Sequence, residues 1–143
     1  MSQNFHALWV HLIWSTKNRE PLITKEIKWP LYEIIREVCK QKGYYLDHIN
    51  GIEDHVHLLM EIKPKFAISD VVKDIKGLSW DWARKQQLLE EYFSWQDGFA
   101  AISVSPSQLH KVRQYIRNQE VHHKRISFED EIKSFEKILD GLF

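Results

Sequence analysis

Hydrophobic residues change their spacing along this chain, and the changes separate strands from helices. Residues 5–14 (FHALWVHLIW) are apolar on both alternating faces, which is typical of a strand covered on both sides. Residues 15–21 then break the run with polar and turn-forming side chains. The pattern predicts a central strand near the start of the chain.

A helical spacing replaces this pattern from about Thr24. Pro30 fits a first helical turn, and Gly43 supplies a stop, so the helix is expected to run to about Lys42. The apolar positions that recur at helical spacing are Leu31, Ile34, Ile35, Val38 and Cys39.

Two further strands follow as a predicted hairpin. Residues 44–52 read as one strand, and the next runs from His55 to near Pro64. Glu53 and Asp54 form the expected turn, although Asn50-Gly51 is an alternative turn dipeptide.

A second helix is predicted from Ser69, as N-cap, to about Gln87, with Gly77 as an interior weak point. Its apolar stripe consists of Val72, Ile75, Leu78 and Trp82. Its basic side consists of Lys73, Lys76, Arg84 and Lys85. Residues 88–94 are ambiguous, and residues 95–104 contain a loop and then a fourth strand with alternating Phe99 and Ala101.

Two helices complete the pattern. Ser105, Pro106 and Gln108 have the spacing of a capping box at the start of a third helix. The stripe of this helix is Leu109, Val112 and Ile116, and the stripe of a fourth helix from Ser127 is Phe128, Ile132, Phe135 and Leu139.

This order of elements predicts an α+β fold of the ferredoxin-like βαββαβ type, with an antiparallel four-stranded sheet and extra C-terminal helices. The length of 143 residues, 43% of them hydrophobic, suits a single domain over residues 1–143. The only cysteine, Cys39, excludes an intramolecular disulfide. With no apolar run of membrane-spanning length and no signal peptide, we expect a cytoplasmic protein without a membrane partner.

Charge is balanced overall but not locally. Twenty basic and 20 acidic residues give zero net charge, which counts mildly against a nucleic-acid partner. Yet residues 110–125 hold five lysines and arginines against Glu120 alone, whereas the terminal helix is acidic. Local charge therefore leaves a basic segment around Tyr115.

His55 and His57, in the segment DHVHLLM, are the first candidates for chemistry. One residue apart on a strand, they point to the same face and form half of a metal site. A pair of ordinary, partly buried histidines is the commoner explanation of such a motif.

A later helix face supplies what the histidines lack. Lys111, Tyr115, Gln119 and His122 follow one another at spacings of four, four and three residues, and so share a face. Cleavage of a phosphodiester by nucleophilic attack needs a nucleophile, a metal ion and basic groups. Tyr115 could be the nucleophile, the histidine pair could bind the metal ion, and the nearby lysines and arginines could hold the DNA backbone. A surface tyrosine on a solvated helix is the alternative.

Five segments make the chain resemble the HUH single-tyrosine transposases of small bacterial insertion sequences (IS200-like), including the transposases associated with repetitive extragenic palindromes (REP). They are HLIWSTKNREPLI, DHVHLLM, ISDVVKDIKGLS, WQDGFAAISVS and YIRNQEVHHK. The resemblance implies that the third helix carries the catalytic tyrosine.

The resemblance also implies roles for individual residues. His55, His57 and Gln119 would bind Mg²⁺ or Mn²⁺, and Tyr115 would attack single-stranded DNA to give a 5′-phosphotyrosine. Asp54, just before the pair, is a candidate to orient an imidazole. Single-stranded DNA with hairpins at the element ends and a homodimer with composite active sites are the implied partners.

Other basic residues are candidates for DNA contacts: Lys76, Lys111, Arg113, Arg117, His122 and Lys124. For His122 and His123, contacts with helix-end carbonyl groups are the commoner role. We expect His11 and His48, in predicted strands, to be structural.

Two alternative functions remain open at this stage. One is a non-catalytic or domesticated protein of the same fold that binds hairpins or single strands without cleaving them. The other is a metal-dependent phosphoesterase in which His55 and His57 activate water and Tyr115 is incidental. Zero net charge leaves the catalytic assignment intact and counts only against tight DNA affinity, as in a domesticated copy. Because Tyr115 and Gln119 share one helical register, the DNA strand transferase is favoured over both alternatives.

Overall fold

A computed structural model describes residues 3–86 and 92–140 of the chain, with side chains through residue 136. Its four antiparallel strands lie in the order β2-β3-β1-β4. They are β1 (Trp9–Ser15), β2 (Tyr45–Ile52), β3 (His55–Glu61) and β4 (Ala100–Val104). This order is that of the ferredoxin-like arrangement, so the predicted α+β fold is confirmed.

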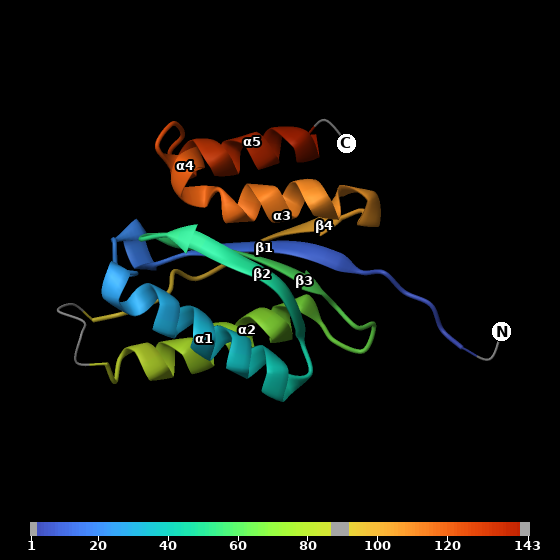
Figure 1. Ribbon diagram of the computed structural model, residues 1–143, viewed down its shortest axis with the longest axis horizontal. Helices are drawn as coiled ribbons and strands as arrows, with labels where there is room; N and C mark the ends of the chain where they lie inside the picture. Colours follow the sequence, from blue (N-terminus) through green and yellow to red (C-terminus); the bar gives the residue numbers. More distant parts are fainter. Residues whose placement is uncertain (1–2, 87–91, 141–143) are drawn as a thin grey trace.

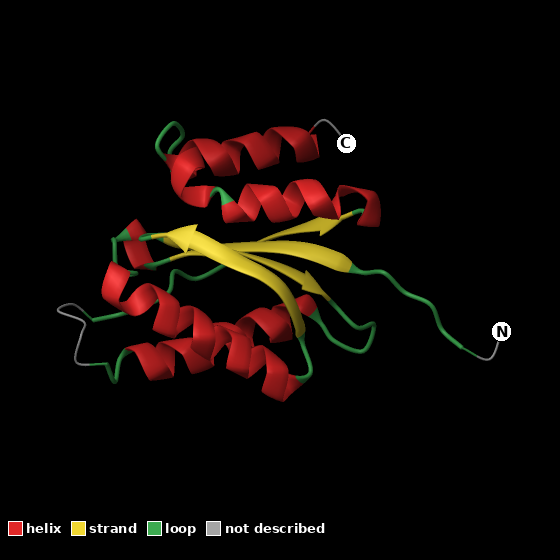
Figure 2. Ribbon diagram, viewed as in Figure 1, coloured by secondary structure: helices red, strands yellow, loops and turns green. Residues whose placement is uncertain are grey.

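Helices cover both faces of the sheet (Figures 1 and 2). One face carries α1 (Lys25–Lys42) and α2 (Ile68–Ala83). The other carries α3 (Leu109–Arg117), α4 (Gln119–His123) and α5 (Phe128–Asp140). Two short 3-10 turns, η1 (Lys17–Arg19) and η2 (Pro106–Gln108), complete the described elements.

Alternation along the strands divides the molecule into two apolar clusters. Even-numbered residues of β1 and β3, such as Leu12, Val56 and Leu58, are fully buried against α1 and α2. Burial of each such side chain contributes about 1.5–3 kcal/mol. On the opposite face, Leu59 packs with Val104 and Ile116 in a smaller cluster that holds α3 on the sheet. His55 and His57 share this second face with Leu59, as the strand period requires.

The hairpin turns at Glu53-Asp54, so the alternative at Asn50-Gly51 is excluded. Gly51 lies inside β2 opposite Val56. A Cβ atom at Gly51 would overlap the carbonyl oxygen of His55 and lie 2.9 Å from the Cα of Val56. Glycine is therefore required there by close approach of the two strands rather than by a turn.

The predicted first strand began too early. Phe5 is 74% exposed, and β1 begins only at Trp9. Trp9 pairs with Glu61 and Val104, which are the last residues of their strands. Before Trp9, the carbonyl group of Leu8 still accepts from the N–H of Ile62 at 2.8 Å.

The ends of α1 and α2 differ from the predicted ends. α1 begins at Lys25, which places Pro30 in the second turn rather than the first. α2 begins at Ile68 after an extended Ala67, so Ser69 is not its N-cap, and it ends at Ala83 rather than near residue 87. Its buried stripe includes Val71, whereas the predicted Leu78 is 41% exposed. Most of the ambiguous stretch 88–94, namely 88–91, lies outside the described residues.

The C-terminal helices also differ in detail. The capping box at Ser105 does not form, because Ser105 gives no side-chain cap and its carbonyl group accepts from the N–H of Gln108 in a 3-10 turn. The third helix is interrupted at Asn118. α5 begins at Phe128, one residue after the predicted start at Ser127, and the Oγ of Ser127 accepts from the N–H of Asp130 at 3.2 Å. The side chain of Leu139 lies outside the described residues. Across the described ranges, we find no helix with the length and apolar character of a membrane span.

Candidate active site

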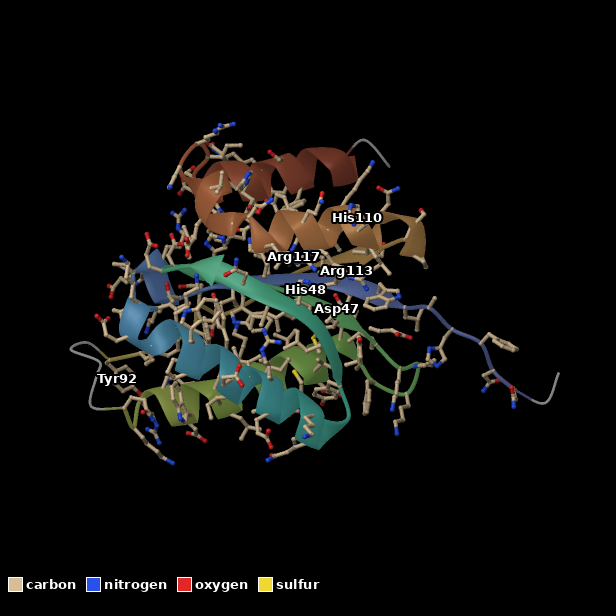
Figure 3. All side chains as sticks on the ribbon, viewed as in Figure 1. Asp47, His48, Tyr92, His110, Arg113 and Arg117 are labelled. Atoms are coloured by element: carbon tan, nitrogen blue, oxygen red, sulfur yellow. The ribbon has the colours of Figure 1, made fainter. Side chains whose placement is uncertain are left out.

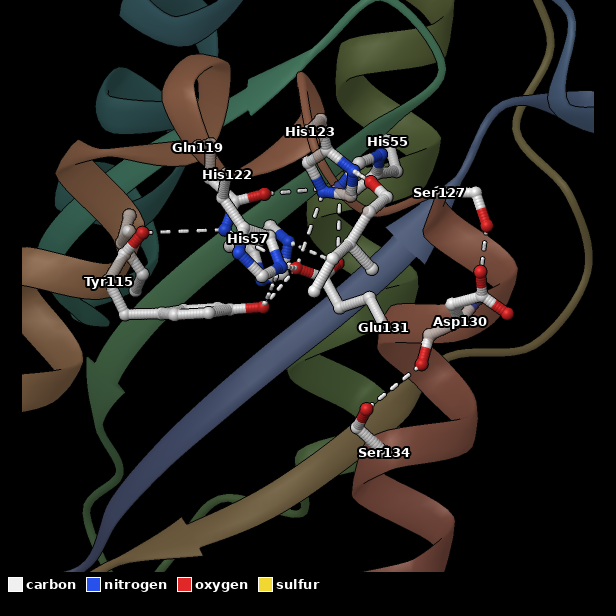
Figure 4. Close-up of polar contacts among 12 residues, drawn as sticks. His55, His57, Tyr115, Gln119, His122, His123, Ser127, Asp130, Glu131 and Ser134 are labelled. Carbon is white, nitrogen blue, oxygen red and sulfur yellow. Dashed lines mark hydrogen bonds and ion pairs between the residues drawn. The ribbon is translucent and has the colours of Figure 1, made fainter.

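His55 and His57 lie at the centre of the layer between the sheet and the C-terminal helices, and both side chains are fully buried. Figure 4 shows them beneath a ring of polar side chains from α3, α4 and α5. The face predicted for the pair is therefore the face that the additional helices cover.

The Nδ1 atom of each histidine contacts a neighbouring polar side chain. The Nδ1 of His55 lies 2.7 Å from Oδ1 of Asp54, and the Nδ1 of His57 lies 2.8 Å from Nε2 of His11. Both Nε2 atoms therefore point into the cluster. Asp54 has the position expected of an orienting group, and His11, expected to be merely structural, contacts a candidate ligand.

A carboxylate, that of Glu131 on α5, meets both Nε2 atoms. Its Oε1 lies 3.0 Å from Nε2 of His57 and 3.4 Å from Nε2 of His55. Oε1 of the fully buried Gln119 lies 3.3 Å from the same nitrogen of His55. The predicted ligands His55, His57 and Gln119 are thus together, with an acid that was not predicted.

Tyr115 lies at the histidine pair of its own chain. Its hydroxyl group donates to Oε2 of Glu131 and lies 3.2 Å from Nε2 of His122. Its ring meets that of His57 edge to face, with centroids 5.7 Å apart. α3 therefore folds back over the sheet, which is the condition that lets one chain supply both halves of the site.

The tyrosine helix is interrupted between Tyr115 and Gln119, and both side chains still face the histidine cluster. α3 ends at Arg117, and α4 starts at Gln119 after Asn118. Asn50 of β2 donates its side-chain N–H groups to the carbonyl groups of Ile116 and Arg117, at 3.0 and 3.1 Å. The strand beside β3 thus holds the end of the tyrosine helix.

Two more histidines flank Glu131. The Nε2 atoms of His122 and His123 lie 3.1 and 3.3 Å from Oε2 of Glu131. The Nδ1 of His123 lies 2.7 Å from the carbonyl oxygen of Ile126, the kind of contact expected near a helix end. His55, His57, His123 and Glu131 offer ligand atoms within 4.8 Å of one another.

Burial and pairing set the protonation of this cluster. Burial lowers the pKa of His57 to about 4 and that of His11 to about 3, so both rings are neutral near pH 7. Burial opposes charge on His55 as well, but hydrogen bonds with Asp54 and Glu131 outweigh it and raise its pKa. Glu131 is ionised, because contacts with His55 and His57 outweigh burial and hold its pKa far below the usual range.

Burial and the contact with Glu131 also raise the pKa of Tyr115 well above its ordinary value, so the phenol is protonated. The donor set of neutral imidazole nitrogen, carboxylate oxygen and amide oxygen suits a divalent metal ion of the first transition row. These residues therefore fit a metal centre beside a tyrosine hydroxyl group.

Some of the candidate DNA-contacting residues are engaged in contacts within the protein, and others are exposed. The ammonium group of Lys76 donates to the carbonyl groups of Gln96 and Gly98, at 2.6 and 3.0 Å, and so holds the loop before β4. Lys111 is exposed on α3, and Lys124 is exposed directly after the end of α4.

Arg113 and Arg117 project from α3 toward β2 (Figure 3). Arg113 donates through Nε and Nη2 to the carboxylate of Asp47, at 2.8 and 3.0 Å. Arg117 donates to Nε2 of His48 at 3.0 Å. Both guanidinium groups thus hold α3 against the edge strand β2. His48, which we expected to be structural, contacts Arg117.

Glu131 was not predicted from the sequence. It lies in an acidic helix, where carboxylates are expected to face solvent. One signal was present. Phe128, Ile132 and Phe135 form the predicted stripe, and Glu131 follows Phe128 at the spacing of three that shares a face. An acid beside an apolar stripe indicates a buried partner.

Comparisons with known proteins identify relatives of this chain. The family model described as "Transposase IS200 like" matches residues 4–119. The chain is 32% identical over 122 residues to ISDra2 transposase TnpA of Deinococcus radiodurans, with 80% of this chain and 85% of that protein covered. It is 26% identical over 122 residues to the transposase for insertion sequence element IS200 of Salmonella typhimurium, with 80% of each covered.

Two solved structures share the fold. A chain from Deinococcus radiodurans R1 assigned as a transposase matches with a TM-score of 0.64 and 30% identity, over 83% of this chain and 98% of that one. A REP-associated tyrosine transposase bound to a REP hairpin matches with a TM-score of 0.61 and 16% identity, over 88% of this chain and 76% of that one. The second likeness concerns the fold alone.

Proposed function

The chain belongs to the IS200-like transposase family, and from this premise we propose that it cleaves and rejoins single-stranded DNA at hairpin-bearing element ends through a 5′-phosphotyrosine intermediate. One observation carries the proposal. The hydroxyl group of Tyr115 contacts Glu131, whose other carboxylate oxygen lies 3.0 Å from Nε2 of His57. A nucleophile and a candidate metal site are thus adjacent within one chain.

Tyr115 is the proposed nucleophile. Its oxygen attacks the phosphorus of the scissile phosphodiester, the bond from phosphorus to the 3′ oxygen breaks, and that oxygen leaves as a 3′-hydroxyl group after taking up a proton. The phenolic proton must leave as the new bond forms, and the carboxylate of Glu131 is the base already in contact with it. Because the product is still a phosphodiester, a 3′-hydroxyl can reverse the reaction without ATP.

His55, His57 and Gln119 are the proposed ligands of a divalent ion, Mg²⁺ or Mn²⁺, and Asp54 orients His55. When bound, the ion would polarise the phosphate oxygens and stabilise the charge of the transition state. Two imidazole ligands favour Mn²⁺ over Mg²⁺, because Mg²⁺ prefers oxygen. The neutral state of His57 leaves a nitrogen lone pair available.

Four basic residues are proposed to contact DNA directly: Lys111, Arg117, His122 and Lys124. Lys76 and Arg113 are proposed to act mainly by holding other parts of the protein, namely the loop before β4 and strand β2. DNA hairpins are the proposed substrate by family resemblance. The relative of known structure bound to a REP hairpin shares this fold. We also propose that residues 1–143 act as a single domain in the cytoplasm, where the DNA substrate lies.

A second copy of the chain is the other proposed partner, as the family resemblance implies. The composite sites that the resemblance also implies would require α3 to dock on the partner's histidines. In the structure, α3 packs on its own sheet through Ile116 and Leu59. We therefore propose a homodimer in which Tyr115 acts beside the histidines of its own chain.

Formation of a covalent adduct tests the function. The protein is incubated with overlapping single-stranded oligonucleotides that tile the DNA on both sides of its gene, with Mn²⁺, Mg²⁺ or EDTA, and adducts are resolved on denaturing gels. We expect a metal-dependent adduct with the wild type and none with Tyr115→Phe. Binding without an adduct on any oligonucleotide would favour the non-catalytic alternative, and cleavage that survives Tyr115→Phe would favour the phosphoesterase.

A further inference from the structure

Glu131 of α5 is the most enclosed acid at the site, with 2% of its surface exposed. The matched family segment ends at residue 119, before α5 begins at Phe128. Figure 4 shows Glu131 reaching from α5 toward His57 and Tyr115. The helix that completes the cluster thus lies beyond the part of the chain that the family model covers.

The separations between donor atoms match those of ligands around one ion. Bonds of about 2.1 Å at right angles place neighbouring ligand atoms about 3.0 Å apart, and tetrahedral angles place them about 3.4 Å apart. Oε1 of Glu131 lies 3.0 and 3.4 Å from Nε2 of His57 and His55. Oε1 of Gln119 lies 3.3 Å from Nε2 of His55. These three separations are compatible with donor atoms arranged around one cation.

We infer that Glu131 is a further ligand of the divalent ion, bound through Oε1 beside His55 and His57, so that docking of α5 is part of the metal site. This inference rests on the metal site of the proposed function. Oε2 remains on Tyr115, so one carboxylate connects the ion with the nucleophile. Since metal binding and α5 docking then stabilise each other, the ion fastens α5 over the site.

Mn²⁺ titration by calorimetry tests this assignment with the wild type, Glu131→Gln and the control Glu136→Gln. Glu136 is an exposed acid on the same helix. We expect Glu131→Gln to weaken Mn²⁺ binding by at least about tenfold, since loss of even an outer-shell partner has effects of this size. Glu136→Gln should bind Mn²⁺ like the wild type.

Hydrogen exchange of α5 supplies a second readout that does not depend on cleavage. Mn²⁺ should slow exchange of the α5 amides in the wild type and in Glu136→Gln, and should not do so in Glu131→Gln. Equal exchange of the three proteins without metal would show that α5 folds and docks in each.

The outcomes separate the two proposals. A wild type that binds no Mn²⁺ or Mg²⁺ overturns the metal site itself. A wild type and a Glu131→Gln variant of equal affinity overturn the role of Glu131 alone. Faster adduct formation by Glu131→Gln, with unchanged metal affinity, also overturns it, because the carboxylate would then only occlude the site.

Discussion

At the scale of single residues, the contact between His11 and His57 is the least expected feature of the site. For Nε2 of His57 to keep a free lone pair, its proton must sit on Nδ1, which lies 2.8 Å from Nε2 of His11. His11 therefore acts as a positioning residue that selects the tautomer of His57.

Replacing His11 tests this role. We expect His11→Leu to lower Mn²⁺ affinity by about 10- to 100-fold, as loss of an orienting partner does at other metal sites. His11→Gln should recover part of the loss, because its amide oxygen can accept from His57. Calorimetric titration measures the effect, and His6→Gln, far from the cluster, is the control. Equal affinities of the leucine and glutamine variants would leave His11 a packing residue.

Strand and helix periods placed His55 with His57, and Tyr115 with Gln119, on common faces, and the family resemblance supplied the role of Gln119 as a candidate ligand. His11 and Glu131 escaped because their contacts depend on register and docking. His11 pairs directly with Leu59 across the strands and reaches His57 only diagonally. Glu131 reaches the site because α5 docks over it, with Phe128 stacked on His55 and Phe135 against His11, and no local period encodes that docking.

At the scale of elements, the tight β2–β3 pairing at Gly51 fixes the strand that carries the histidines. We expect Gly51→Ala to lower the free energy of unfolding by about 3 kcal/mol or more, because its Cβ would overlap the backbone at His55. Gly77→Ala is the matched comparison. It meets nothing within 4 Å in the middle of α2 and should raise stability by about 0.5–1 kcal/mol.

Urea unfolding of both variants measures these changes. A Gly51→Ala protein as stable as the wild type would contradict the close approach of the two strands. A destabilised Gly77→Ala protein would contradict the open space around that position.

The ion pair between Asp47 and Arg113, which joins β2 to α3, predicts a dependence on pH. Burial alone would raise the pKa of Asp47, but hydrogen bonds from Arg113 and His48 outweigh it and lower the pKa. A depressed folded-state pKa stabilises the protein above the unfolded-state value, about 3.9, and this stabilisation is lost as the pH falls through the folded-state pKa.

Asp47→Asn should therefore be less stable than the wild type at pH 6, and the difference should shrink below about pH 4. Thermal unfolding of both proteins across this range checks the prediction. Asp81→Asn removes an exposed pair with Arg84 and should show little effect at any pH. If the difference in stability between the wild type and Asp47→Asn were the same at pH 6 and pH 3, the ion pair would be ruled out as its cause.

At the scale of the whole molecule, the order of elements was enough to predict the ferredoxin-like sheet, because short connections leave few other ways to pair four strands. Helix ends were predicted less well, since Ala67 and Asn118 end or begin helices through backbone geometry rather than through side-chain caps. The side of the sheet that α3 and α5 cover was not predictable from any one segment. It follows from Leu59, Val104 and Ile116 forming a second apolar cluster.

That second cluster decides whether Tyr115 serves its own chain. Equal amounts of Tyr115→Phe and His57→Ala chains are unfolded together, refolded to allow exchange, and assayed for the covalent DNA adduct. With α3 packed on its own sheet, each chain lacks one half of its site, and we expect no recovery of activity. If the sites were composite, half of the dimers would contain one chain of each variant. Each mixed dimer would hold one intact site out of two, so about a quarter of wild-type activity would return. That result would move α3 onto the partner while leaving the roles of Tyr115 and His57 intact.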